Sequence, residues 1–220
     1  MERHLSFSIR FFIVGFVLSL LAASAGCRGS GGIPVGDQSR APDRSKWKLG
    51  RFERLKGSDY LMAPLYSGEK TGEYSFSDGS PDIVRNYMFV NSADKSSRWL
   101  IASGDYLILE QKKLPLIDER DRADQPAAKW IYYELVNRDT DQDKFLTYKD
   151  RRIIAVSDAT GASFVELITD IDSVLGLTMR DENTLVVIYS ASSKNLISEI
   201  NLSERKIAAT SELAEIALKP

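Results

Sequence analysis

The sequence predicts an all-β fold built as an antiparallel meander, and three observations carry that expectation. Short runs rich in β-branched and aromatic residues recur along the chain, and strands favour this composition. Turn-forming residues separate the runs, as at 103–105, 159–161 and 181–183. A strand–turn–strand plan recurs three times along the chain.

Each expected strand follows from its own pattern. The run 184–189 is continuously apolar, which suits a strand buried on both faces. In the strand that follows it, Leu196, Ser198 and Ile200 share one face. A short terminal helix is expected over 211–218, where apolar residues have helical spacing. The expected strands are 84–90, 99–102, 106–109, 129–136, 152–157, 184–189 and 196–202.

The three repeats share one period. Their turns centre near residues 94, 160 and 204, which lie 66 and 44 residues apart. Two insertions, 116–127 and 139–150, account for the longer spacing. A period of ~40–50 residues is typical of one propeller blade. The repeats therefore resemble the outer hairpins of a β-propeller.

The number of blades does not follow from these repeats alone. Closed propellers have ~4–8 blades, and three periods are visible. The favoured architecture is an incomplete propeller of about three blades. A first blade hidden in 47–76 is one alternative, and a β-sandwich is the runner-up fold.

An N-terminal leader ends at the chain's one cysteine. Basic residues precede an apolar run over 11–23, and small residues then lead to Cys27, which are the three parts of a secretory signal. The run is short for a membrane span, which needs ~20 apolar residues. The stretch Ser24-Ala25-Gly26-Cys27 resembles the lipobox of bacterial lipoproteins, although leucine is usual where Ser24 stands. The resemblance implies cleavage before Cys27 and attachment of fatty acids such as palmitate to it.

Three segments follow from this interpretation: a signal peptide over 1–26, a lipidated cysteine with a flexible tether over 27–45, and a β-rich domain over 46–220. The tether is rich in glycine, proline and serine and has no apolar period. An ordinary cleaved signal and an uncleaved anchor are the alternatives. In the lipoprotein family an aspartate after the cysteine retains the protein at the inner membrane, and Arg28 stands there instead. In a host with two membranes, this favours the outer membrane facing the periplasm.

Composition excludes several classes of function. Without the leader's Arg3, Arg10 and Glu2, 27 basic residues face 30 acidic ones, a net charge near −3, and no basic stripe is present. Nucleic acid is therefore not an expected partner. The lone histidine, His4, lies in the leader, so histidine-based catalysis and histidine-ligated metals are not expected. We expect no enzymatic activity.

An acidic loop over 139–150 is the chain's one chemical motif. It resembles the calcium loop of EF-hands, with acids at positions 1, 3, 5 and 12 and an apolar residue at position 8. Lys144 replaces the usual glycine and Asp150 the usual glutamate. The alternative is an exposed acidic turn neutralised by nearby basic residues. The candidate calcium ligands are Asp139, Asp141, Asp143, Phe145, Thr147 and Asp150.

Taken together, the sequence predicts a membrane-anchored lipoprotein of the bacterial cell envelope. Its expected role is that of a non-enzymatic interaction or scaffold module for an envelope protein. A hydrolase that uses paired carboxylates on envelope polysaccharide is one alternative. A calcium-stabilised binder of sugars or small ligands is the other.

Overall fold

The computed structural model describes residues 33–34, 47–67, 83–116 and 126–214. The leader, Cys27 and most of the predicted tether lie outside the described residues. All regular structure in the described part is β, and its strands pair antiparallel, which confirms the predicted fold class. None of the described residues forms a helix long and apolar enough to cross a membrane.

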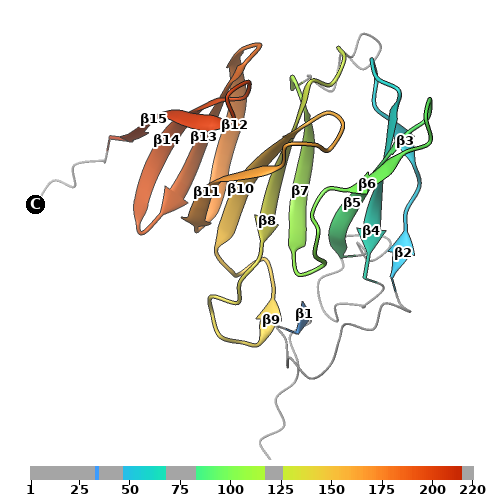
Figure 1. Ribbon diagram of the computed structural model, residues 1–220. Helices are drawn as coiled ribbons and strands as arrows, with labels where there is room; N and C mark the ends of the chain where they lie inside the picture. The colour runs from blue at the N-terminus through green and yellow to red at the C-terminus, as the bar shows by residue number, and fades with distance from the viewer. Residues whose placement is uncertain (1–32, 35–46, 68–82, 117–125, 215–220) are drawn as a thin grey trace, which may run out of the picture.

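The longer strands form three antiparallel layers, and the layers follow one another in an open row (Figure 1). The first layer contains β2 (Lys48–Leu49), β3 (Glu53–Arg54), β4 (Tyr60–Tyr66), β5 (Val84–Asn91) and β6 (Ser97–Trp99). The central layer contains β7 (Leu107–Leu114), β8 (Trp130–Val136), β10 (Arg152–Asp158) and β11 (Val165–Ile171). The third layer contains β12 (Ser173–Asp181), β13 (Thr184–Ala191), β14 (Lys194–Asn201) and β15 (Lys206–Glu212).

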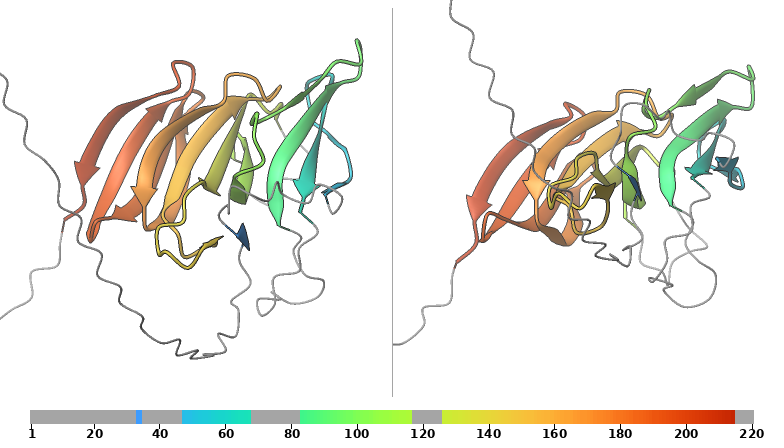
Figure 2. Two further views of the ribbon diagram at one scale, coloured as in Figure 1. Left: turned by 60° about the horizontal axis from the view of Figure 1, so that its bottom comes forward. Right: turned by 90° about the horizontal axis from the view of Figure 1, so that it is seen from below.

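Strand pairing joins the first and central layers at one point only in the described chain. β5 pairs with β7 through a single registered pair, Val84 and Ile108. The nine strands therefore count as one sheet, but its two halves pack face to face around a shared core. The third layer is a separate four-stranded sheet. This stack of antiparallel layers is that of an incomplete β-propeller, and Figure 2 shows that the row stays open in other views.

The central layer is buried on both faces because its apolar residues do not alternate with polar ones. Ile131 and Tyr133 point into the first core and Tyr132 into the second, as the two-residue period of a strand requires. The first core lies between the first and central layers and includes Leu55, Met62, Tyr87, Phe89, Ile108, Leu135 and Ile153. The second lies between the central and third layers and includes Leu114, Ile154, Val156, Ile168, Ile171, Leu185, Val187 and Ile200.

The turns predicted near residues 94, 160 and 204 are confirmed as the turns of three equivalent hairpins. They connect β5 to β6, β10 to β11, and β14 to β15, the last hairpin of each layer. The terminal helix is wrong where the structure describes it, because residues 211 and 212 belong to β15. There Ser211 pairs with Ile197 and Glu212 with Leu196, and these ladder bonds outweigh the helical spacing of a short terminal segment.

Candidate functional site

The acidic loop connects β8 to β10 at one end of the central layer. It contains the two-residue strand β9 (Phe145–Leu146). β9 pairs antiparallel with β1 (Ile33–Pro34), which lies within the predicted tether. The loop and β1 therefore lie together at the same end of the molecule (Figure 1). No pattern in the sequence indicates this pairing.

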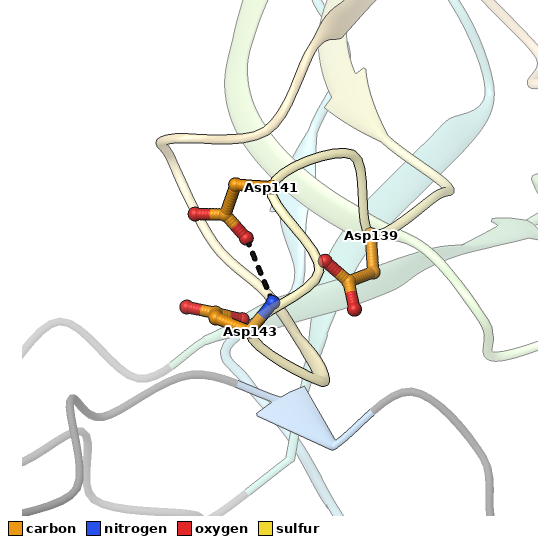
Figure 3. A group of neighbouring side chains, drawn as sticks. All are labelled: Asp139, Asp141 and Asp143. Carbon is orange, nitrogen blue, oxygen red and sulfur yellow. Dashed lines mark hydrogen bonds between the residues drawn. The ribbon is translucent and has the colours of Figure 1, made fainter.

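Three of the predicted ligands converge. One oxygen from each of Asp139, Asp141 and Asp143 lies within 4.8 Å of the others (Figure 3). Backbone amides hold the cluster in place. Lys144 N donates to Asp139 Oδ2 at 2.8 Å, and Phe145 N donates to Asp143 Oδ1 at 2.8 Å.

Two local conformations allow this convergence. Gln142 has a φ of 63° and Lys144 a φ of 72°, both in the left-handed region that side chains with a Cβ rarely adopt. Lys144 stands where the resembled calcium loop has glycine, and it takes the glycine-like conformation. The loop thus combines an unfavourable backbone conformation with three neighbouring negative charges. Other interactions must offset the free-energy cost of both.

The cluster contains an unpaired oxygen and carboxylates that repel one another. The Asp139 Oδ1 atom is buried and accepts no hydrogen bond. The pKa of Asp141 is raised, first by partial loss of hydration and then by repulsion from Asp143 and Asp150, while the amide of Asp143 opposes the rise. A divalent cation would relieve both the unpaired oxygen and the repulsion.

Asp150 lies apart from the three clustered aspartates, and its role as a calcium ligand stays a prediction. The residue is 1% exposed, and its two oxygens accept hydrogen bonds from the backbone of the loop. Thr140 N and Thr147 N donate to it at 2.5 and 2.7 Å. These bonds close the loop, and Asp150 is not among the three clustered carboxylates. Thr147 Oγ1 likewise accepts a bond from Lys149 N at 3.1 Å.

Sequence reasoning missed a second group of charges, on the central layer. Glu134 is 4% exposed and binds Arg152, and Glu110 lies opposite it in the β7–β8 register. Loss of hydration raises the pKa of Glu134, and Arg152 opposes this rise. Glu110 itself pairs with Lys112 at 2.6 Å. The signal in the sequence was a single glutamate inside the apolar run of β8.

A carboxylate hydrolase needs two acids near each other, and Glu110 and Glu134 are neighbours across the β7–β8 ladder. Each of the two acids is held by its own cation, however. This is the pattern of a structural ion-pair network, and we do not propose catalysis there.

The chain is similar to a few solved structures only at low sequence identity. No protein-family model matches the chain, and no curated protein matches it. Among solved structures, it is similar to the β-propeller domain of the Trilobed protease from Pyrococcus furiosus, described as having an open velcro topology. That match has 12% identity and a TM-score of 0.37, and covers 76% of this chain and 43% of the other.

The chain is also similar to the Dos1 propeller, with 12% identity, a TM-score of 0.38, and coverage of 76% of this chain and 48% of the other. It thus spans less than half of each of these structures.

Proposed function

We propose that the chain is a lipid-anchored, non-enzymatic interaction module of the bacterial cell envelope, held to a membrane through Cys27. The leader and the lipobox-like stretch before Cys27 support the anchor. Two or more acyl chains would give stable attachment, whereas one chain gives only marginal binding. Arg28 favours the outer membrane in a host with two membranes.

The stretch before Cys27 is the observation that carries this proposal, and the pairing of β1 with β9 would orient the anchored domain. Ile33 lies six residues after Cys27, and a segment of that length spans at most ~20 Å. With the lipid on Cys27, the acidic loop would lie close to the bilayer, and the rest of the domain would extend away from it. Such an orientation presents the layered sheets to an envelope protein.

The test is metabolic labelling of the full chain with a palmitate analogue, followed by membrane fractionation. Wild type should take up label and sediment with membranes. Cys27→Ala should lose both label and membrane attachment, whereas the nearby Ser30→Ala should keep both. A Cys27→Ala chain that remains on the membrane without label would refute the anchor.

We also propose that the acidic loop binds calcium in a structural role, through Asp139, Asp141 and Asp143. The buried, unbonded Asp139 Oδ1 beside two further carboxylates supports this second proposal. Calcium takes 6–8 oxygen ligands at ~2.3–2.6 Å, so backbone carbonyls and water would complete its shell. The ion would hold the loop and, through β9, the paired segment β1.

Thermal unfolding of the full chain with and without calcium tests this role. Extracellular calcium modules bind at ~10⁻⁴–10⁻³ M, so millimolar calcium should raise the melting temperature by a few degrees. Asp141→Ala should abolish the rise. Asp105→Ala, an exposed aspartate outside the loop, should retain it. An equal response in wild type and Asp141→Ala would exclude the site.

A further inference from the structure

The third layer ends the row, and its two faces differ in what covers them. Leu185, Val187 and Tyr189 point into the second core and are buried. By the two-residue period of a strand, Val186 and Ile188 must point the other way. We call that side the outer face, and the described residues place no other layer against it (Figure 1).

The centre of the outer face is aliphatic. Ile197 on β14 pairs with Ile188 on β13, and Val186 lies beside them on the same face. Leu175, at a bulge on β12, is 55% exposed, the highest value among the large hydrophobic residues described. A solvated face of an antiparallel sheet is normally polar, whereas this one has an apolar centre.

The rim of the outer face is polar and electrically balanced. Thr184 pairs with Asn201, and Ser190 with Asn195, at the two ends of the β13–β14 ladder. The charges on β12 and β14, Arg180 and Glu199, form an ion pair with each other. An apolar centre within a polar rim is the usual anatomy of a protein interface. Because the charges cancel, a second identical face would not be repelled.

The central layer shows how this molecule covers such a surface. Its two faces also have apolar centres, and another layer packs on each. The outer face repeats that composition without a covering layer. A further sheet of the same kind is therefore the occupant that continues the stacking.

The area of the face is sufficient for a stable pair. Four strands of 7 to 9 residues lie ~4.8 Å apart and cover roughly 500 Å² in plan. Pleating and side chains increase the accessible area. Two such faces together therefore bury about 1,000 Å² or more, which specific interfaces need.

We propose that the outer face of the third layer is a self-association surface, on which the same face of a second copy docks. The pairing is isologous, so one two-fold axis relates the copies and the contact closes at two. This inference goes beyond the proposed anchoring and does not depend on it. A dimer would place two tethers on the same membrane and raise the total attachment.

Gly176 supplies a probe that leaves the single chain intact. A Cβ built at Gly176 meets no atom within 4 Å, and Gly176 pairs with Ile188 at the centre of the outer face. Gly176→Trp should therefore fold and yet prevent close approach of a second sheet. Leu175→Glu places a charge on the same surface. Leu49→Glu, at a residue 45% exposed on the first layer, is the matched control.

The experiment is sedimentation of the full chain in a density-matched detergent over a range of concentrations. Wild type should form a dimer, and Leu175→Glu and Gly176→Trp should each weaken it at least tenfold. Leu49→Glu should associate like wild type, and all variants should melt as cooperatively as wild type. Association through the leader would be insensitive to Leu175→Glu and would overturn the proposal.

Other outcomes also overturn it. A wild-type chain that stays monomeric at high micromolar concentration has no such surface for itself. Equal weakening by Leu49→Glu and Leu175→Glu would place the contact elsewhere. A monomer that retains a different envelope protein, and loses it on Leu175→Glu, would assign the outer face to that partner instead.

Discussion

The two faces of the central layer bury neighbouring tyrosines in different ways. Tyr132 and Tyr133 are adjacent on β8, and both are completely buried. Tyr133 faces the first layer, and its hydroxyl is 3.1 Å from Ser157 Oγ. Tyr132 faces the third layer, and its hydroxyl has no hydrogen-bond partner in the described structure.

An ion pair with a buried carboxylate lies on the same face as Tyr132. Glu134 and Arg152 lie on the face toward the third layer, in the rows of Tyr132 and Ile154. The Arg152 Nε and Trp130 Nε1 atoms on that face are also buried without a partner, whereas Gln111 Nε2 is such an atom in the row of Tyr133. The apolar residues of the central layer thus account for the burial of both faces. They do not determine whether the buried polar atoms find hydrogen-bond partners. The following variants test this contrast.

The largest expected effect is that of Arg152→Met. It leaves Glu134 buried without its cation, at a cost of about 3 kcal/mol at neutral pH, near the low end for buried pairs because Arg152 is partly exposed. The pKa of Glu134 is raised already, so the protonated form favours the folded state. The stability that protonation supplies is complete below the ordinary carboxyl pKa and is lost as pH rises through the raised one.

The loss in Arg152→Met should therefore shrink in mild acid, when unfolding in urea is compared with wild type at each pH. Adding Glu134→Gln to Arg152→Met should remove most of that pH dependence. A loss that is the same in acid and at neutral pH would mean that the uncompensated carboxylate is not its cause.

A smaller effect is expected on the other face, at Gly161. Gly161 has a φ of 73°, and a Cβ there would lie 2.3 Å from the Phe89 ring. Gly161→Ala should cost about 2 kcal/mol through backbone strain and overpacking. Phe89→Leu should reduce the additional cost of Gly161→Ala, since the two residues share one contact. Strict additivity in urea midpoints would argue against the contact.

Sequence patterns predicted the strands whose burial is simple. The runs at β8, β10 and β13 are apolar because the sheets cover them, and the hairpin turns have clear turn residues. β4 and β12 were missed. β4 contains Pro64, which is atypical of strands, and β12 contains Gly176 and two irregularities of register. Pairing with neighbouring strands fixes both, and a single-strand pattern does not carry that information.

The candidate site, like the fold, was predicted only in part. Alternating aspartates indicated a loop that gathers carboxylates, and Asp139, Asp141 and Asp143 do converge. Spacing did not reveal that loop amides use both oxygens of Asp150. Nor did it reveal the pairing of β1 with β9, because a two-residue strand has no periodicity. These details depend on hydrogen bonds between segments distant in sequence.

The smallest effect is also the most direct comparison of the two faces. Tyr133→Phe should cost about 1 kcal/mol, because it removes the bond to Ser157, which retains its bond to the Asp158 carbonyl oxygen at 2.8 Å. Tyr132→Phe should be neutral or stabilising by up to about 1 kcal/mol, because it removes a buried hydroxyl without a partner.

The two substitutions change the same atoms on adjacent residues, so effects on the unfolded chain cancel in the difference between their urea midpoints. Burial raises the pKa of both phenols, so both remain neutral at the pH of the measurement. The sign of the difference therefore reports hydrogen bonding alone. If Tyr132→Phe costs as much as Tyr133→Phe, the hydroxyl facing the third layer is satisfied too, and the two faces are equivalent in their polar contacts.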